Sequence, residues 1–168
     1  MGRVRVDAFS ISLDGFAAGD GQSLDNPLGR GGPALHQWMF DSGVSMPTAP
    51  DMGDIDAQMA ERALEGIGAW IMGRNMFGPV RGPWPDDQWQ GWWGPNPPYH
   101  CPVYVLTHHA RAPIEMEGGT VFHFVTGGIE EAMGLARRSA QGRDIRIGGG
   151  AATVRQYLEA RMIDDIHL

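Results

Sequence analysis

Three consecutive glycines between an apolar run and a helical pattern are the residues that most clearly offer chemistry. Residues 145–147 are β-branched around an arginine, Gly148, Gly149 and Gly150 follow, and a helical pattern begins at Ala151. Glycine lacks a Cβ, so its backbone can approach a ligand closely. The first turn of a helix presents unpaired N–H groups that suit a phosphate. The motif predicts a nucleotide or dinucleotide ligand; a purely steric strand-to-helix turn is the alternative.

Two further apolar runs end in groups that bind phosphate. The groups are Gly73, Arg74 and Asn75 after the first run, and Leu106, Thr107, His108 and Arg111 after the second. Ligands of an open α/β sheet bind outside the carboxyl ends of its strands, and arginine hydrogen-bonds phosphate oxygens through two parallel N–H groups. Three such strand ends predict one extended, phosphorylated ligand. Taken singly, Arg74 and Arg111 fit a solvated surface position equally well.

Several aspartates and one histidine near the long first loop could deliver a proton. They are Asp14, Asp51, Asp54, Asp56 and His36. Asp54 also suits a helix cap, and Asp14 suits a turn. A histidine such as His36 could donate a proton near neutral pH, although a histidine in a loop serves equally for packing.

No metal site is expected. His108 and His109 are adjacent, so on a strand they would point to opposite faces. Cys101 is the single cysteine, which excludes a disulfide framework or a cysteine-based zinc site within one chain. It has no credible triad partner, and a free-thiol protein fits the cytoplasm.

Size and charge narrow the class of partner. The chain has 168 residues and 42% hydrophobic composition, which fits one domain over 1–168 with a substantial core. Its formal charge of −7 argues against a broad nucleic-acid surface. No apolar run could span a bilayer, and the start lacks the apolar core of a signal peptide. Of these partner classes, a small-molecule ligand is the one that the composition favours.

Strand and helix patterns alternate along the chain, which predicts an α/β fold with a mostly parallel sheet covered on both faces. Strands are expected at 3–13, 69–72, 103–107, 120–126, 144–147 and 163–168, and helices at 54–67, 129–140 and 151–162. Long loops are expected at 14–53 and 78–102. The last strand either forms a sheet edge or precedes C-terminal closing strands that the sequence lacks.

The second loop is rich in tryptophan, with Trp84, Trp89, Trp92 and Trp93 among prolines and glycines. Three roles are compatible with this pattern: capping a pocket and stacking on a flat heterocycle, forming a subunit interface, or anchoring the loop on the core.

The order of these pieces resembles the dihydrofolate reductase fold, and in particular the reductase family related to the C-terminal domain of the riboflavin-pathway deaminase/reductase. The resemblance rests on residues 9–16, 71–74, 105–107 and 147–150 with the helix that follows, and it covers essentially the whole chain. A two-half Rossmann domain fits less well, because its glycine fingerprint should follow the first strand.

The resemblance implies an NADPH-dependent reductase and a homodimer. The pyrophosphate would lie at Ile147, Gly148, Gly149, Gly150, Ala151, Ala152 and Thr153, with Gly73, Arg74 and Asn75 also meeting the phosphates. The adenosine ribose and its 2′-phosphate would face Leu106, Thr107 and His108, assisted by Arg111. Ile11, Ala18 and Gly19 would lie beside the nicotinamide.

The substrate implied is a small pterin, pyrimidine or related conjugated heterocycle. Folate-reducing enzymes of this fold carry a carboxylate on their first helix, and no residue here matches it. The missing carboxylate argues against folate reduction, but it does not argue against use of the cofactor. Two alternatives stay open: a dinucleotide-binding sensor, and a pterin- or flavin-binding protein without reductase turnover.

Overall fold

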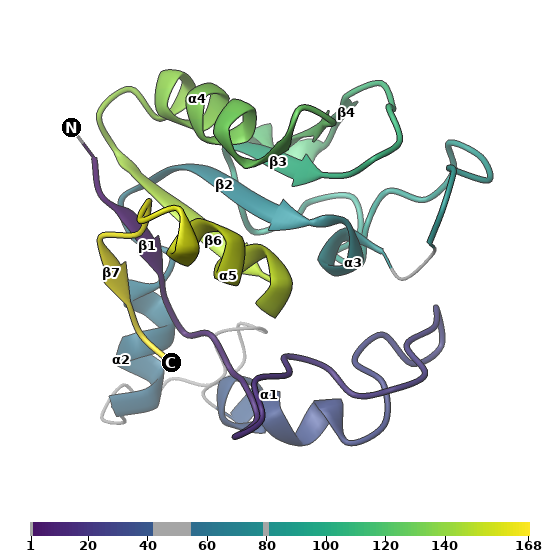
Figure 1. The fold of residues 1–168 in the computed structure, drawn as a ribbon, viewed down its shortest axis with the longest axis vertical. Helices are drawn as coiled ribbons and strands as arrows, with labels where there is room; N and C mark the ends of the chain where they lie inside the picture. Colours follow the sequence, from purple (N-terminus) through teal and green to yellow (C-terminus); the bar gives the residue numbers. More distant parts are fainter. Residues whose placement is uncertain (1, 42–54, 79–80) are drawn as a thin grey trace.

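A central sheet with helices on both faces forms the body of the molecule (Figure 1). The computed structural model describes residues 2–41, 55–78 and 81–168. Within them, seven strands form one sheet in the order β4-β5-β3-β2-β6-β1-β7. The strands are β1 (Val4–Val6), β2 (Ile67–Gly73), β3 (Pro102–Leu106), β4 (Ile114–Glu115), β5 (Val121–Val125), β6 (Asp144–Gly149) and β7 (Asp165–Ile166). All paired strands are parallel except β4, which runs antiparallel to β5, so the mostly parallel sheet is confirmed.

The helices divide between the two faces of the sheet. They are α1 (Gly32–Asp41), α2 (Ile55–Arg62), α3 (Arg74–Phe77), α4 (Gly128–Ala140) and α5 (Ala151–Glu159). Helices α4 and α5 pack on one face, with Ala69 and Ile71 of β2. The opposite face of β2, with Trp70 and Met72, packs against α3 and the tryptophan-rich segment 81–101. Every residue of β2 is buried, as expected for a strand covered on both sides.

The first strand is shorter than predicted. It ends at Val6 instead of continuing to residue 13, because Ala8 adopts a φ of 50°, outside the β region. A turn follows in which the Phe16 amide donates to the Ser12 hydroxyl at 3.0 Å. Leu13, expected to be covered, lies fully exposed on this turn.

Other element boundaries also differ from the predictions. The loop expected over 14–53 contains α1, which the glycines and proline at its start obscure in the sequence. The last helix ends at Glu159, before residue 162, and the final strand covers only Asp165–Ile166. Strand β4 was not predicted because two residues carry no periodicity.

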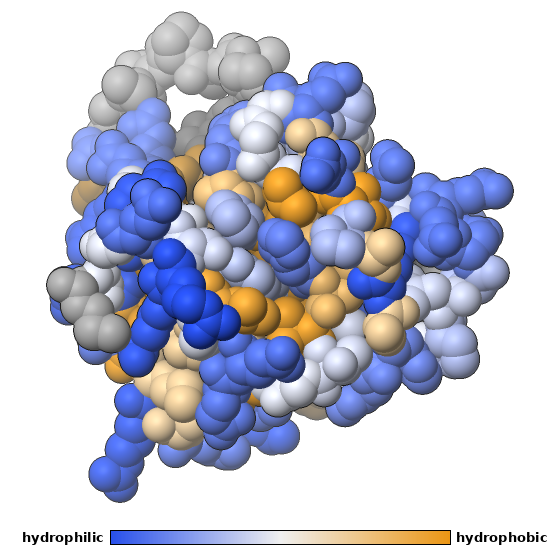
Figure 2. All heavy atoms as spheres, turned by 90° about the horizontal axis from the view of Figure 1, so that it is seen from above, coloured by the Kyte–Doolittle hydropathy of each residue, from blue (hydrophilic) through white to orange (hydrophobic). Residues whose placement is uncertain are grey.

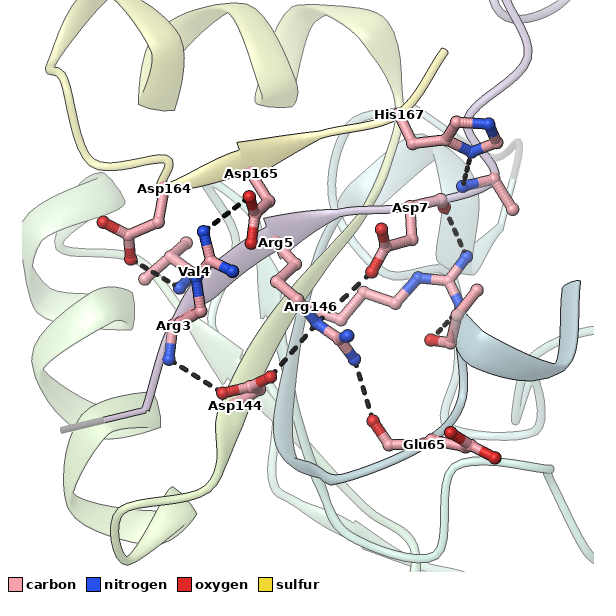
Figure 3. Close-up of polar contacts among 12 residues, drawn as sticks. Arg3, Val4, Arg5, Asp7, Glu65, Asp144, Arg146, Asp164, Asp165 and His167 are labelled. Atoms are coloured by element: carbon pink, nitrogen blue, oxygen red, sulfur yellow. Dashed lines mark hydrogen bonds and ion pairs between the residues drawn. The ribbon is translucent and has the colours of Figure 1, made fainter. Parts of the chain in front are cut away.

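Buried arginines join β1 and β6 to the end of α2 (Figure 3). Arg146 donates to the carbonyls of Ala63 and Asp7, both at 2.7 Å. The Arg5 Nε lies 3.3 Å from carboxylate oxygens of both Asp7 and Asp144. These contacts compensate the buried charges and fix α2 and the end of β1 against the sheet, although Arg5 Nε, Asp7 Oδ2 and Arg146 Nε have no hydrogen-bond partner among the described residues.

The surface is ordinary for a globular domain. Figure 2 shows the molecule from above, relative to Figure 1. Hydrophilic residues cover most of this side of the molecule, and apolar residues are visible between them near the middle. Among the described residues, no helix is long and apolar enough to cross a membrane.

Candidate functional site

The carboxyl ends of β2 and β6 meet at the start of α5. A Cβ placed on Gly73, the last residue of β2, would collide with the Thr153 hydroxyl on α5. The same Cβ would lie 3.6 Å from the Gly149 oxygen and the Gly150 nitrogen. Because the strands are parallel, the separate glycine motifs of the sequence fall on one edge. The predicted residues Gly73, Gly149, Gly150 and Thr153 are therefore brought together.

The three consecutive glycines, two at the end of β6 and one just beyond it, have three different surroundings. A Cβ on Gly148 would lie 3.0 Å from the Trp70 ring, and one on Gly149 would lie 3.0 Å from Phe9. Gly149 also has a φ of 130°, which favours glycine. Packing and backbone conformation therefore account for the first two glycines. At Gly150, whose peptide bond to Gly149 is cis, a Cβ would have no described heavy atom within 4 Å apart from those of its chain neighbours.

The β6 ladder is irregular at these glycines. Ile71 of β2 pairs with Ile147, whereas Met72 pairs with Gly149, so Gly148 is an extra residue on β6. Such a bulge bends a strand and changes the direction of the backbone beyond it. Gly150 then precedes α5 directly, and its carbonyl accepts hydrogen bonds from the Thr153 and Val154 amides at 2.9 and 3.1 Å. The remaining N–H groups in the first turn of α5 therefore lie next to Gly150, where the backbone is open.

Arg74 and Arg111 come together around one tryptophan. The Arg74 Cζ lies 3.1 Å from the centroid of the Trp84 ring, and the Arg111 Cζ lies 4.8 Å from it. Burial and the nearby charge of Arg111 lower the pKa of the Arg74 guanidinium to about 10, so it remains a cation at neutral pH. The two arginines that the sequence places at separate strand ends form one cationic cluster.

The residues after β3 differ in how they face the solvent. Thr107 is buried, and its hydroxyl accepts a hydrogen bond from the His109 amide at 3.2 Å, which closes a turn. His108 is exposed, while Leu106 packs partly against the core. His108 thus offers a polar group at this edge, whereas the Thr107 hydroxyl and the buried Arg111 side chain are already engaged.

A hollow of about 370 Å³ lies between the first long loop and α3. It is lined by Phe16, residues 18–22, Asn75 and Arg81. The Asn75 amide donates to the Gln22 side-chain oxygen at 2.7 Å and so fastens the loop to α3. The predicted residues Ala18, Gly19 and Asn75 meet here, whereas Ile11 packs partly against the core. The volume is within the range of small-molecule sites, roughly 300–1,000 Å³.

Of the candidate proton donors, the structure describes the side chains of Asp14 and His36, and each is engaged in a local contact. Asp14 is exposed and accepts a hydrogen bond from the Ser12 hydroxyl at 2.5 Å, which is a turn role. His36 lies on α1, with its Nε2 3.2 Å from the Ala17 carbonyl oxygen. Asp51 and Asp54 lie outside the described residues, and Asp56 falls in α2.

Comparison with known protein families gives a match over nearly the whole chain. The model of the RibD C-terminal domain matches residues 6–168. The chain belongs to the RibD C-terminal domain family. This membership makes it a reductase-type domain, and the dihydrofolate-reductase-like fold inferred from the sequence is confirmed.

One solved structure is similar in fold. It is a protein from Shewanella sp. PV-4 assigned to riboflavin biosynthesis, 20% identical, with a TM-score of 0.52. The likeness covers 99% of this chain and 74% of the other. No curated protein matches the sequence.

Sequence reasoning missed Phe9 and Met76 at this edge, and it named Trp84 without its contacts to the arginines. Phe9 and Met76 pack around Gly149, and Trp84 lies between the arginine side chains and the core. A phenylalanine, a methionine and a loop tryptophan look like core residues in the sequence, and only their spatial neighbours distinguish them. Among the described residues, no group of three or more His, Cys, Asp or Glu side chains could hold a metal ion.

The residues present fit a phosphate-bearing cofactor of this reductase family. The backbone at Gly150 has room beside it for a ligand, and the N-terminus of α5 supplies N–H groups at the same place. A buried cationic pair lies at the neighbouring strand ends. The fit therefore rests on an open backbone turn and on positive charge.

Proposed function

We propose that this RibD-type domain is an NADPH-dependent reductase of a small pterin, pyrimidine or related conjugated heterocycle. The observation that carries the proposal is the meeting of Gly73, Gly150 and the start of α5 at one edge, beside the Arg74–Arg111 cluster. An open glycine turn and two guanidinium groups suit a ligand with several phosphates.

Each strand end contributes to one extended binding groove. The pyrophosphate would be held by Gly73, Arg74, Asn75, Ile147, Gly148, Gly149, Gly150, Ala151, Ala152 and Thr153. The adenosine ribose and 2′-phosphate would face Leu106, Thr107, His108 and Arg111, and the nicotinamide would lie near Ile11 and Ala18. The added negative charge of the 2′-phosphate favours NADPH over NADH at a cationic cluster.

The contribution of the chain to the reaction is positioning and electrostatics. When bound, the cofactor would supply a hydride to the acceptor. The N–H groups of α5 and the Arg74 guanidinium would fix the phosphates. The loop fastened by the Gln22–Asn75 hydrogen bond would cover the reacting groups and exclude water. The 370 Å³ hollow is of a size that suits a small-molecule acceptor.

The reductase proposal is tested by mixing the protein with NADPH and a panel of dihydrofolate, pyrimidinone and quinone acceptors. We expect NADPH binding by fluorescence and a fall in absorbance at the nicotinamide band with at least one acceptor. Binding without turnover on any acceptor would favour the dinucleotide sensor. Binding of a pterin or flavin without binding of a dinucleotide would favour the third alternative.

Replacing Arg74 by alanine tests the role of the cationic cluster. The substitution removes one charge-assisted contact to phosphate, so we expect NADPH affinity to fall roughly tenfold or more, as for the loss of about 1.5–3 kcal/mol. Circular dichroism should report an unchanged fold. An unchanged affinity in a folded Arg74→Ala variant would remove Arg74 from the site.

Two properties of the whole protein accompany this proposal. We infer a cytoplasmic location from the unpaired and buried Cys101, which fits a reducing compartment. The homodimer implied by the family stays a prediction, which sedimentation of the purified chain would test. We expect a small-molecule substrate and no nucleic-acid partner.

A further inference from the structure

We propose that Trp84 is a positioning residue, whose indole holds the Arg74 guanidinium in the orientation that receives a phosphate of the cofactor. The inference rests on the proposed function and adds to it a role for the tryptophan-rich segment. It predicts that affinity for phosphorylated ligands depends on a side chain from outside the glycine motifs.

The first support is the contact between the two side chains. The Arg74 Cζ is 3.1 Å from the Trp84 ring centroid, so the guanidinium lies directly against the indole face. Such a contact is attractive, most strongly where water is excluded. The ring attracts the cation as a whole, so this contact uses none of the guanidinium N–H donors. The contact therefore restricts the position of Arg74 without using its donors.

The second support is that the indole is itself fixed. Its Nε1 donates a hydrogen bond to the His109 carbonyl at 2.8 Å. Its ring meets Phe77 and Phe124 edge to face, with centroids 5.9 and 5.0 Å apart. Trp84 is thus attached both to the turn after β3 and to the apolar core. A rigid platform of this kind reduces the conformational freedom that Arg74 would lose when a ligand binds.

The third support is the second cation at the same ring. The Arg111 side chain is only 3% exposed, and it is held by the Asp87 carbonyl at 2.8 Å and by the Asp87 carboxylate at 3.5 Å. That carboxylate is 93% exposed, so solvent weakens its compensation of the charge. Arg74 is partly buried, and its Nε and Nη1 atoms are enclosed. The cluster therefore brings two guanidinium groups to one ring, where the exposed Asp87 carboxylate compensates the Arg111 charge only weakly, an arrangement that favours an added anion.

Two substitutions of Trp84 separate its aromatic face from its volume. Trp84→Leu keeps an apolar side chain but removes the aromatic face, and Trp84→Phe keeps an aromatic face. Trp93→Leu is the matched control, because Trp93 packs in the same apolar cluster against Tyr99 and Phe122. Each variant is titrated calorimetrically with NADPH and with adenosine 2′,5′-bisphosphate, and its thermal unfolding is measured in parallel.

We expect Trp84→Leu to weaken binding of both ligands by about tenfold, the size of a partly desolvated cation–π contact. Trp84→Phe should restore the affinity to within about threefold of the wild type. Trp93→Leu should lower the thermal midpoint while leaving both affinities unchanged. This pattern would separate a positioning role from a general loss of stability.

Other results overturn the inference. Equal affinities of Trp84→Leu and the wild type would refute it, and so would equal losses of affinity in Trp84→Leu and Trp93→Leu. If Trp84→Leu does not fold, the wild-type indole N–H resonance of Trp84 decides, and the Trp84→Phe variant serves to assign it. That resonance should shift on adding adenosine 2′,5′-bisphosphate, and an unmoved resonance would contradict the role. A wild-type protein that binds neither ligand would instead overturn the proposed function itself.

Discussion

Gly73 and Thr153 lie in contact where β2 ends and α5 begins, and the absence of a single methyl group allows this approach. The sequence identifies Gly73 by its place after an apolar run, as it does Arg74 and Gly150. The contacts of Trp84 with Arg74 and Arg111 could not be predicted in this way. They depend on the path of a long loop that has no periodic pattern.

A cycle of two substitutions tests the contact between β2 and α5. In Gly73→Ala the new methyl group collides with the Thr153 hydroxyl, so we expect a loss of about 1–3 kcal/mol in the free energy of unfolding, typical of overpacking. Thr153→Ala removes the hydroxyl, so the double variant should recover much of that loss. Urea unfolding of the wild type, the two single variants and the double variant gives the coupling free energy between the two residues. Strictly additive losses would show that the two residues do not meet.

The thiol of Cys101 provides a prediction about pH. Burial raises its pKa from 9.0 to about 11, so the folded protein holds this proton over a range where the unfolded chain releases it. The resulting stability is fully present below pH 9 and is lost as the pH rises through 11. At pH 9, iodoacetamide should therefore label the folded protein far more slowly than the urea-unfolded chain. Equal labelling rates would contradict the burial of the thiol.

Helix α2 shows how an element is fixed by groups outside its own sequence. Its amphipathic pattern predicts the helix, but the carbonyls that follow it are bound by Arg146 of β6 and Arg5 of β1 (Figure 3). A strand arginine between apolar neighbours gives no sequence signal of its partners. Helix α1 was missed for a related reason, since Pro33 at a helix start resembles a loop residue.

Replacing Arg146 measures the docking of α2. Arg146→Met removes the donors to the Ala63 and Asp7 carbonyls and leaves both without these hydrogen bonds, so we expect a loss of about 2–4 kcal/mol in the free energy of unfolding. Arg155→Met is the control, because its ion pair with Glu159 is exposed and should contribute less than about 0.5 kcal/mol. Chemical denaturation compares the two variants. Losses of equal size would contradict the docking role of Arg146.

At the scale of the whole molecule, the alternation of strands and helices was sufficient to predict the fold class, and it predicts the edge where the glycine and arginine motifs gather. Parallel strands collect their carboxyl ends on one side, so short motifs far apart in sequence converge. The substrate is less predictable. The hollow between the first loop and α3 is built from irregular backbone, and Asp51 and Asp54 lie outside the described residues. The sequence therefore predicts the class of cofactor in more detail than it predicts the substrate.

The central claim is that the turn at Gly150 receives the phosphates of NADPH, and calorimetric titration of wild type and Gly150→Val tests it most directly. Gly150 has a φ of −79° and free space around its Cβ position, so valine should cost no more than about 1 kcal/mol of stability at this cap. The same side chain would fill the ligand's place. We predict NADPH binding by the wild type and a loss of roughly a hundredfold or more in Gly150→Val, with little change in the unfolding midpoint. Undiminished binding by the folded variant, or no binding by the wild type, would contradict the account.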